Sequence, residues 1–163
     1  MKRKETVVFL MKKDLDGVKV LLGLKTMKLG EGKRNGYGGG VKKKESLRES
    51  AVRELEQELG IVVASEDLME QGFLDISIRT GIWKTDQHQL YIFLLYNWQG
   101  EFKDGNGELV DPQWFNIDSL PANLIDSDKA WLPYILHGQK IQGSILVRKL
   151  GQKIVSLNFD VIY

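Results

Sequence analysis

The sequence has no cysteine and almost no net charge, and each of these facts excludes a class of function. Without thiols, the chain forms no disulfide, no zinc–thiolate site and no cysteine nucleophile. The 23 lysine and arginine residues nearly balance the 22 aspartate and glutamate residues, which leaves a formal charge of +1. This balance gives no support for binding to a nucleic-acid polymer, because such proteins usually carry a strongly basic surface.

Long apolar runs are also missing. No segment approaches the ~20 apolar residues that cross a membrane. The basic start MKRKET leads into a strand-like segment and has no signal-peptide cleavage site. The chain shows no internal repeat and no low-complexity stretch. With 163 residues, of which 42% are hydrophobic, we expect one domain over residues 1–163, cytoplasmic and without a membrane partner.

The stretch from residue 38 to residue 61, GGGVKKKESLRESAVRELEQELGI, combines a glycine loop with a helix. Three glycines let the backbone approach a ligand closely. Good helix formers run from Glu45 to Leu59, and Gly60 stands at the C-terminal cap position. Apolar residues gather on one side of this helix, where they can pack on a sheet: Leu47, Ala51, Val52, Leu55 and Leu59.

Glu54 and Glu58 are four residues apart, so their carboxylates lie on adjacent turns at one edge of the apolar face. Like charges at this spacing slightly destabilise an isolated helix, and a cation between them removes that cost. Mg²⁺ typically takes one or two carboxylates together with waters and phosphate oxygens. The pair therefore indicates a Mg²⁺ site, and a solvated acidic helix edge is the simpler alternative.

Strands outnumber helices in the rest of the chain. Strands are expected at residues 6–11 and 18–23, 68–79 and 88–98, 113–116, 144–149, and 153–161. The segments 13–17, 25–38, 80–87 and 100–107 read as connections, and a second helix is expected at 130–137 with Asp126 or Asp128 as its N-cap. This pattern suits an α+β fold, an α/β/α sandwich around a mixed β-sheet.

The stretch 38–61 resembles the signature of the Nudix family, G-x5-E-x7-R-E-U-x-E-E-x-G-U, in which U is aliphatic. The matching residues are Gly39, Glu45, Arg53, Glu54, Leu55, Glu58, Gly60 and Ile61. Gln57 departs from the signature, because the family has a glutamate there. A neutral amide offers one oxygen to a metal but brings no charge.

The resemblance implies the Nudix fold, which is of the α/β/α type, and hydrolysis of a nucleotide diphosphate linkage with Mg²⁺, or with Mn²⁺ as the alternative ion. The implied metal ligands are the Gly38 carbonyl, Glu54, Gln57 and Glu58. Glu54 also orients the attacking water in the family, and Arg53 forms a supporting ion pair with Glu45. The metal neutralises charge that develops on the phosphoryl oxygens.

Many family members add an acid from a loop beyond this signature. Glu108 is our candidate for that base or ligand, and Asp111 and Asp104 are alternatives. An exposed loop acid is more often only solvated. A row of three lysines, Lys42, Lys43 and Lys44, either attracts a triphosphate or forms a solvated loop.

A closer resemblance, over most of the chain, is to the MutT-like triphosphatases that remove oxidised purine nucleotides. The similar segments are 22–25, 34–39, 112–115 and 131–133. In those enzymes the base is bound by an Asn before the glycine loop, which Asn35 matches, and by Asp residues before the second helix. Asp128 matches one of these, but Ser127 stands at its partner position. The further substrate-binding candidates are Lys25, Gly39 and Trp131, of which Trp131 reads as core or pocket wall.

Three functions follow from these residues. The first is a Mg²⁺-dependent hydrolase that releases a nucleoside monophosphate and pyrophosphate from a nucleoside triphosphate, with oxidised purine nucleotides such as 8-oxo-dGTP as substrates. The second is a Nudix hydrolase for a dinucleoside polyphosphate or nucleotide sugar. The third is a nucleotide-binding module with weak catalysis. Asn35 and Asp128 favour the first, and Gln57 keeps the third open.

Overall fold

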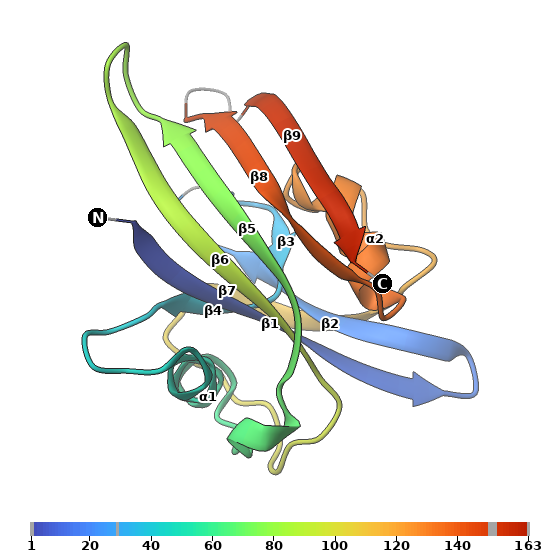
Figure 1. The fold of residues 1–163 in the computed structure, drawn as a ribbon. Coiled ribbons are helices and arrows are strands. Elements are labelled where there is room, and N and C mark those ends of the chain that lie inside the picture. The colour runs from blue at the N-terminus through green and yellow to red at the C-terminus, as the bar shows by residue number, and fades with distance from the viewer. Residues whose placement is uncertain (1, 29, 150–152, 163) are drawn as a thin grey trace.

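The computed structural model describes residues 2–28, 30–149 and 153–162 and shows a mixed sheet between two helices (Figure 1). The strands are β1 (Arg3–Asp14), β2 (Gly17–Lys25), β3 (Arg34–Asn35), β4 (Tyr37–Gly40), β5 (Met69–Arg79), β6 (Thr85–Leu95), β7 (Leu109–Asn116), β8 (Lys140–Arg148) and β9 (Lys153–Ile162). The helices are α1 (Leu47–Leu59), α2 (Asp128–Leu136) and the short 3₁₀ helix η1 (Ser65–Asp67). None of these described helices is long and apolar enough to cross a membrane.

The sheet has the order β3-β2-β1-β6-β5-β8-β9, with β4 beside β1 and β7 beside β2. Strands β1 and β6 run parallel, as do β5 and β8, and the other pairs are antiparallel. The prediction of a mixed sheet is therefore confirmed.

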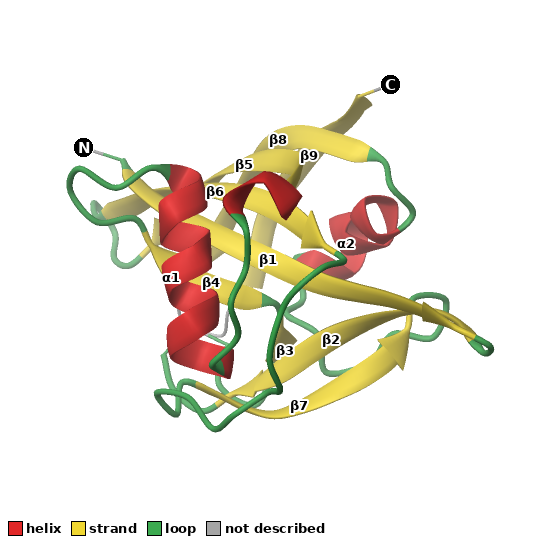
Figure 2. Ribbon diagram, turned by 90° about the horizontal axis from the view of Figure 1, so that it is seen from below, coloured by secondary structure: helices red, strands yellow, loops and turns green. Residues whose placement is uncertain are grey.

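Strand β1 is buried on both faces because its side chains alternate between two cores. Val7, Phe9 and Met11 belong to the core that α2 covers. Val8 and Leu10 belong to the core that α1 covers. Figure 2 shows α1 across one face of the sheet, with α2 beyond its other face, so the expected α/β/α arrangement is confirmed.

Helix α1 starts two residues later than the sequence predicts, because Ser46 caps it. The Ser46 hydroxyl accepts a hydrogen bond from the Glu49 backbone N–H, and the Glu49 carboxylate accepts one from the Ser46 N–H in return. The helix ends at Gly60, whose φ of 69° is left-handed, as its predicted cap position requires. These local signals fix the orientation of the acidic edge of α1.

Helix α2 starts at Asp128, and neither predicted N-cap is correct. Ser127 precedes the helix and makes no side-chain capping bond. The Asp126 carboxylate instead lies 3.2 Å from the Lys129 Nζ and 3.8 Å from the Lys33 Nζ. The Asp128 side chain is buried at the start of the helix.

Several strands are longer than their apolar runs predict. Segment 25–38, expected to be irregular, contains β3 and the start of β4, because Asn35 pairs with Gly23 and Gly38 with Val7. Strands β7 and β8 begin four residues before their predicted starts, at residues 109 and 140 rather than 113 and 144. The connection between β5 and β6 is shorter than expected, at residues 80–84. The resulting hairpin extends past both helices (Figure 1).

Candidate functional site

A cleft of about 680 Å³ lies on the sheet between the glycine strand β4, the edge of α1 and the start of α2. Its lining contains most of the predicted site residues: Lys25, Asn35, Gly38, Gly39, Arg53, Glu54, Gln57, Glu58, Glu108, Asp128 and Trp131. Glu45 is absent from this lining and reaches the cleft only through Arg53. The fold thus brings residues from distant parts of the chain to one cavity.

Arg53 connects the predicted acids on α1 to the loop before the helix. Its Nε and Nη2 donate to the two Glu45 carboxylate oxygens at 2.6 and 3.0 Å. Its Nη1 donates to the Glu54 Oε1 at 2.7 Å. These bonds from Arg53 lower the pKa of Glu45 to about 2. Arg53 therefore fixes the Glu54 carboxylate against the glycine strand.

Gln57 lies on the same edge of α1. Its Oε1 accepts a bond from the Arg53 Nη1 at 3.3 Å, so the amide oxygen is already oriented by the guanidinium. Within residues 2–28, 30–149 and 153–162, no three His, Asp or Glu side chains form a metal-binding group. A metal in this cleft would therefore need two carboxylates completed by neutral oxygens.

Glu58 is a buried carboxylate, with a relative exposure of 2%. It accepts a hydrogen bond from the Gly38 N–H at 3.0 Å. Burial, followed by the charge of Glu54, raises the pKa of Glu58 to about 8. A divalent cation would remove this penalty on the charged form, so the donor set fits such an ion.

The glycine strand leaves no room for side chains beside these acids. A Cβ on Gly38 would overlap the backbone carbonyl of Thr6, and a Cβ on Gly39 would lie 2.6 Å from the Glu54 Oε1. The two glycines therefore have different roles: Gly38 allows β4 to pack on β1, whereas Gly39 makes space for a carboxylate.

Of the three loop acids considered, Glu108 is the one that lines the cleft. Its Oε1 lies 3.0 Å from the Lys28 Nζ, and its side chain is 41% exposed. Asp111 is turned to Arg34, with 2.6 Å between its Oδ2 and the Arg34 Nη2, and does not line the cleft. Asp104 does not line it either. The two alternatives to Glu108 are therefore not supported.

Asn35 and Asp128 both present polar groups to the cleft. The Asn35 Oδ1 accepts a bond from the Gly36 N–H at 2.8 Å, which leaves its NH₂ group as the donor. Asp128 is 7% exposed, and among the described residues its side chain accepts one hydrogen bond, from the Ser127 hydroxyl at 3.4 Å. Burial raises the pKa of Asp128 to about 7, against the opposing charge of Lys25.

Trp131 forms part of the cleft wall. It is 1% exposed and packs edge-to-face on Phe9 with 6.1 Å between ring centroids. This contact fits the predicted role as core or wall. Its indole N–H has no hydrogen-bond partner among the described residues.

Sequence reasoning missed the part of the cleft lined by Thr6, Ile76, Ile78, His88 and Leu90. The alternation of Ile76 and Ile78 with polar residues in β5 identifies them as inward-facing. The sequence does not show that α2 leaves these cleft-lining positions uncovered. Their exposure depends on how far β5 and β6 extend past the helix.

The family model described as the NUDIX domain matches residues 1–135. The chain belongs to the NUDIX family. It is thus a hydrolase of the family that acts on phosphoanhydride bonds of nucleotides, and NUDIX hydrolases generally use divalent metal ions.

The relatives of this NUDIX chain include two enzymes named oxidized purine nucleoside triphosphate hydrolase. The one from Danio rerio is 33% identical over 126 residues, which cover 77% of this chain and 76% of the relative. The one from Mus musculus is 32% identical with the same coverage.

Among solved structures, the MutT protein from Bacillus halodurans has a TM-score of 0.79 at 23% identity, covering 97% of both chains. A MutT NUDIX hydrolase from Burkholderia pseudomallei has a TM-score of 0.66 at 19% identity, covering 80% of this chain and 95% of that one. These similarities confirm the predicted fold.

The burial of Asp128 predicts a pH dependence of stability. Because its pKa rises from 3.8 in the unfolded chain to about 7 in the fold, its stabilising contribution is complete below pH 4 and declines as the pH rises toward 7. The variant Asp128→Asn lacks this decline. Between pH 5 and pH 8, urea unfolding should show the wild type losing roughly 2 kcal/mol more than the variant. If the unfolding free energies of the two proteins changed in parallel with pH, the predicted role of Asp128 would be contradicted.

Proposed function

We propose that this NUDIX protein is a Mg²⁺-dependent nucleoside triphosphate pyrophosphohydrolase, and that oxidised purine nucleotides such as 8-oxo-dGTP are its substrates. One observation carries the proposal: a single cleft holds the acidic pair Glu54 and Glu58 together with the polar pair Asn35 and Asp128. The names of the two animal relatives support the same substrate class.

The acidic part of the cleft suits a triphosphate bound with Mg²⁺. Glu54, Glu58, the Gly38 carbonyl and the Gln57 amide oxygen would hold the ion. When bound, Mg²⁺ supplies charge neutralisation at the phosphoryl oxygens and orientation of the attacking water. Arg53 keeps Glu54 in place through the bond of 2.7 Å, so this carboxylate needs no reorganisation during the reaction.

Glu108 and Lys25 would complete the phosphate-binding part of the cleft. Glu108 lines the same cleft as Glu58, and its charge contributes to the raised pKa of Glu58, which supports a role for Glu108 as the proton acceptor for water. Lys25 also lines the cleft, and its charge opposes the rise in the pKa of both Glu58 and Asp128. A cation there would bind the phosphates.

The remaining polar groups would read the base. Asn35 offers a donor, and Asp128 offers an acceptor when ionised or a donor when protonated. A buried site with unpaired polar groups discriminates strongly against ligands that leave those groups unpaired. Ser127 adds a hydroxyl at the position where the resemblance implies a second acid, which changes the donor and acceptor pattern available to the base.

Gln57 favours a second candidate, a NUDIX module that binds nucleotides with little catalysis. Its amide replaces one anionic ligand, and the described residues provide no third acid in its place. The two candidates differ in turnover. We expect a panel of normal and oxidised nucleotides, incubated with Mg²⁺ or Mn²⁺, to show pyrophosphate release from oxidised purine triphosphates. Tight binding of a nucleotide without release would support the module.

The variant Gln57→Glu tests the cost of the amide directly. A carboxylate at this position restores a negative charge beside Glu54, so we expect Mn²⁺ to bind severalfold more tightly and pyrophosphate release to be preserved or raised. Isothermal titration calorimetry with Mn²⁺ measures the affinity. Gln87→Glu is the matched control, because it adds the same charge at an exposed position outside the cleft. Equal affinity of wild type and Gln57→Glu would show that position 57 does not contact the metal.

A further inference from the structure

The β5–β6 hairpin ends in a turn that projects beyond both helices (Figure 1). Residues 80–84 connect the strands, and the Thr80 N–H donates to the Lys84 carbonyl at 2.9 Å. Directly after the neighbouring strand β8, the Lys149 N–H donates to the Arg79 carbonyl at 3.0 Å. Backbone hydrogen bonds therefore hold the base of the turn.

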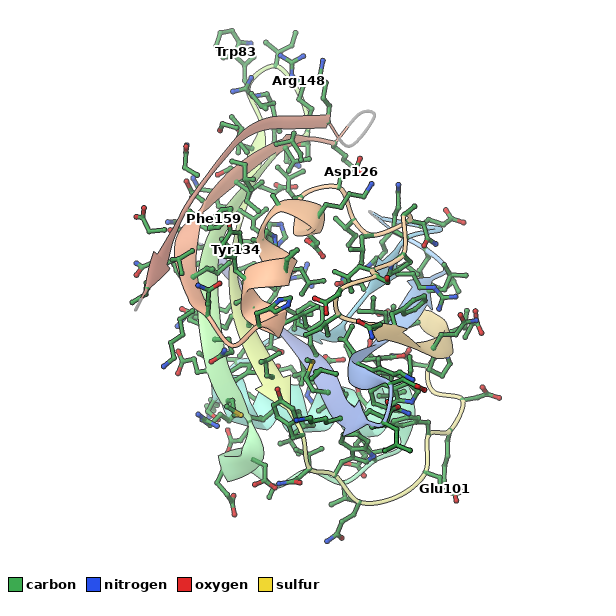
Figure 3. All side chains as sticks on the ribbon, turned by 90° about the vertical axis from the view of Figure 1, so that its right-hand side faces the viewer. Trp83, Glu101, Asp126, Tyr134, Arg148 and Phe159 are labelled. Atoms are coloured by element: carbon green, nitrogen blue, oxygen red, sulfur yellow. The ribbon has the colours of Figure 1, made fainter. Side chains whose placement is uncertain are left out.

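Two large apolar side chains occupy the outermost positions of this turn. Ile82 is 87% exposed and Trp83 is 97% exposed. Figure 3 shows Trp83 at the extreme end of the molecule. Neighbouring aliphatic and aromatic side chains with almost their whole surface in water contribute nothing to the fold. They gain free energy only when a partner removes them from water.

A row of three basic side chains crosses the sheet next to this turn. In the strand register, Arg79 of β5 lies opposite Arg148 of β8, and Arg148 lies opposite Lys153 of β9. The three side chains therefore lie side by side on one face of the sheet. Like charges directly opposite in a sheet are destabilising. No salt bridge of the described residues includes any of the three, nor Lys84 or Lys149 beside them. This basic row therefore lacks a counter-charge and suits an anionic partner.

The basic row and the cleft lie on opposite faces of the sheet. Ile78 and Val147 line the cleft, and they are the strand neighbours of Arg79 and Arg148. Because side chains alternate along a strand, the basic row lies on the other face. Asp86 pairs with Ile78 and so lies on the cleft face, away from the row. A partner bound at the basic row leaves the cleft open to nucleotides.

We propose that this end of the molecule attaches the protein to an anionic lipid surface. Ile82 and Trp83 enter the interfacial layer, where tryptophan is favoured, while the basic row and Lys84 contact the headgroups. Each basic residue near such a surface is worth about a fivefold gain in binding. This proposal differs from the expectation of no membrane partner, but it agrees with the expected cytoplasmic location, because the cytoplasmic leaflet carries the anionic lipids.

Two other partners fit this end less well. A narrow turn with two apolar side chains is far smaller than the ~800 Å² that each partner buries in a stable protein–protein interface. Single-stranded nucleic acid would use Trp83 for stacking, but the aliphatic Ile82 beside it provides no stacking surface. A lipid interface uses both side chains together with the basic row.

The test is co-sedimentation of the full chain with vesicles. We expect binding to vesicles in which a third of the phosphatidylcholine is replaced by phosphatidylserine, and at least tenfold weaker binding to phosphatidylcholine alone. The double variant Ile82→Ser/Trp83→Ser and the triple variant Arg79→Gln/Arg148→Gln/Lys153→Gln should each reduce binding about tenfold or more. Leu15→Ser is the matched control, because Leu15 is a fully exposed apolar residue on the β1–β2 turn, and we expect no effect.

Nucleotide hydrolysis should stay unchanged in these variants, since none of the altered residues lines the cleft. The melting temperature should not fall, and the triple variant should melt at the same temperature or higher because it removes like charges that lie opposite one another. Failure of the wild type to bind phosphatidylserine vesicles overturns the proposal. So does equal binding by the double variant. Anisotropy that detects single-stranded DNA binding, or sedimentation velocity that detects a Trp83-dependent dimer, in a protein that ignores vesicles would assign the turn to those partners instead.

Discussion

Replacing Glu58 with glutamine should reduce pyrophosphate release by at least about a hundredfold. Glutamine has the same size as glutamate, and its amide oxygen can still accept the hydrogen bond from the Gly38 N–H. The substitution nevertheless removes one of the two carboxylates that face the glycine strand. We expect Mn²⁺ affinity, measured by calorimetry, to fall in parallel. The loss of activity then follows from the loss of the ion rather than from a change in the fold.

The stability of Glu58→Gln separates this effect from unfolding. Burial raises the pKa of Glu58 from 4.5 to about 8, so its favourable contribution is complete below pH 4.5 and is lost as the pH rises through 8. A neutral glutamine does not lose it. At pH 9 without metal, the variant should therefore melt at a higher temperature than the wild type.

Glu56→Gln is the control for Glu58→Gln. Glu56 is exposed on α1 and does not line the cleft, so its replacement should leave both activity and metal affinity unchanged. Full activity of Glu58→Gln, or an equal loss in Glu56→Gln, would contradict the proposed roles.

Alanine at the neighbouring glycines of β4 should have two different effects: at Gly38 it should reduce stability, and at Gly39 it should reduce activity. Gly38→Ala should destabilise the protein by about 3 kcal/mol or more, because the added methyl group overlaps the Thr6 backbone and forces β4 away from β1. For a chain of this size, such a loss lowers the melting temperature by roughly 6 °C or more. Differential scanning calorimetry measures it.

Gly39→Ala should instead keep the fold and lose activity. Its methyl group meets the Glu54 carboxylate at 2.6 Å, and a flexible side chain can move away at little cost. The displaced Glu54 would no longer sit where Arg53 holds it, and a shift of ~1 Å in a catalytic group costs on the order of a hundredfold in rate.

Gly81→Ala is the control for both glycine variants, since the nearest atom to its added methyl group is the Lys84 Cβ at 3.9 Å. It should change stability by less than ~0.5 kcal/mol and leave activity intact. Similar melting temperatures for Gly38→Ala and Gly39→Ala would show that the two positions do not differ in the way the packing indicates.

The elements that the sequence predicts well are those with local signals. The end of α1 at Gly60 and its apolar face were readable because cap residues and a period of 3.6 lie within one short stretch. The start of β6 could not be predicted from the sequence, because Thr85 and Asp86 are polar. They become strand residues only by pairing with Arg79 and Ile78 of β5. The sequence shows the apolar run but not the partner that extends it.

The same distinction applies to the site. The positions of Glu54 and Glu58 beside Gly38 follow from the spacing in one motif. The choice among Glu108, Asp111 and Asp104 depends on Arg34, which lies in another strand and pairs with Asp111. Nor does the sequence show that Glu108 is paired with Lys28, because that contact joins two loops.

The position of β1 has a consequence for folding kinetics. Its parallel neighbour β6 lies across the sequence beyond α1 and β5, as register pairs such as Val7 with Ile92 show. Helix α1 packs on Val8 and Leu10 of β1, but the core that it covers also includes Phe93 and Leu95 of β6, which join it only after this long loop has closed. Distant pairings of this kind slow folding. The core beneath α1 should therefore be completed late, in the same cooperative step that joins β6 to the centre of the sheet.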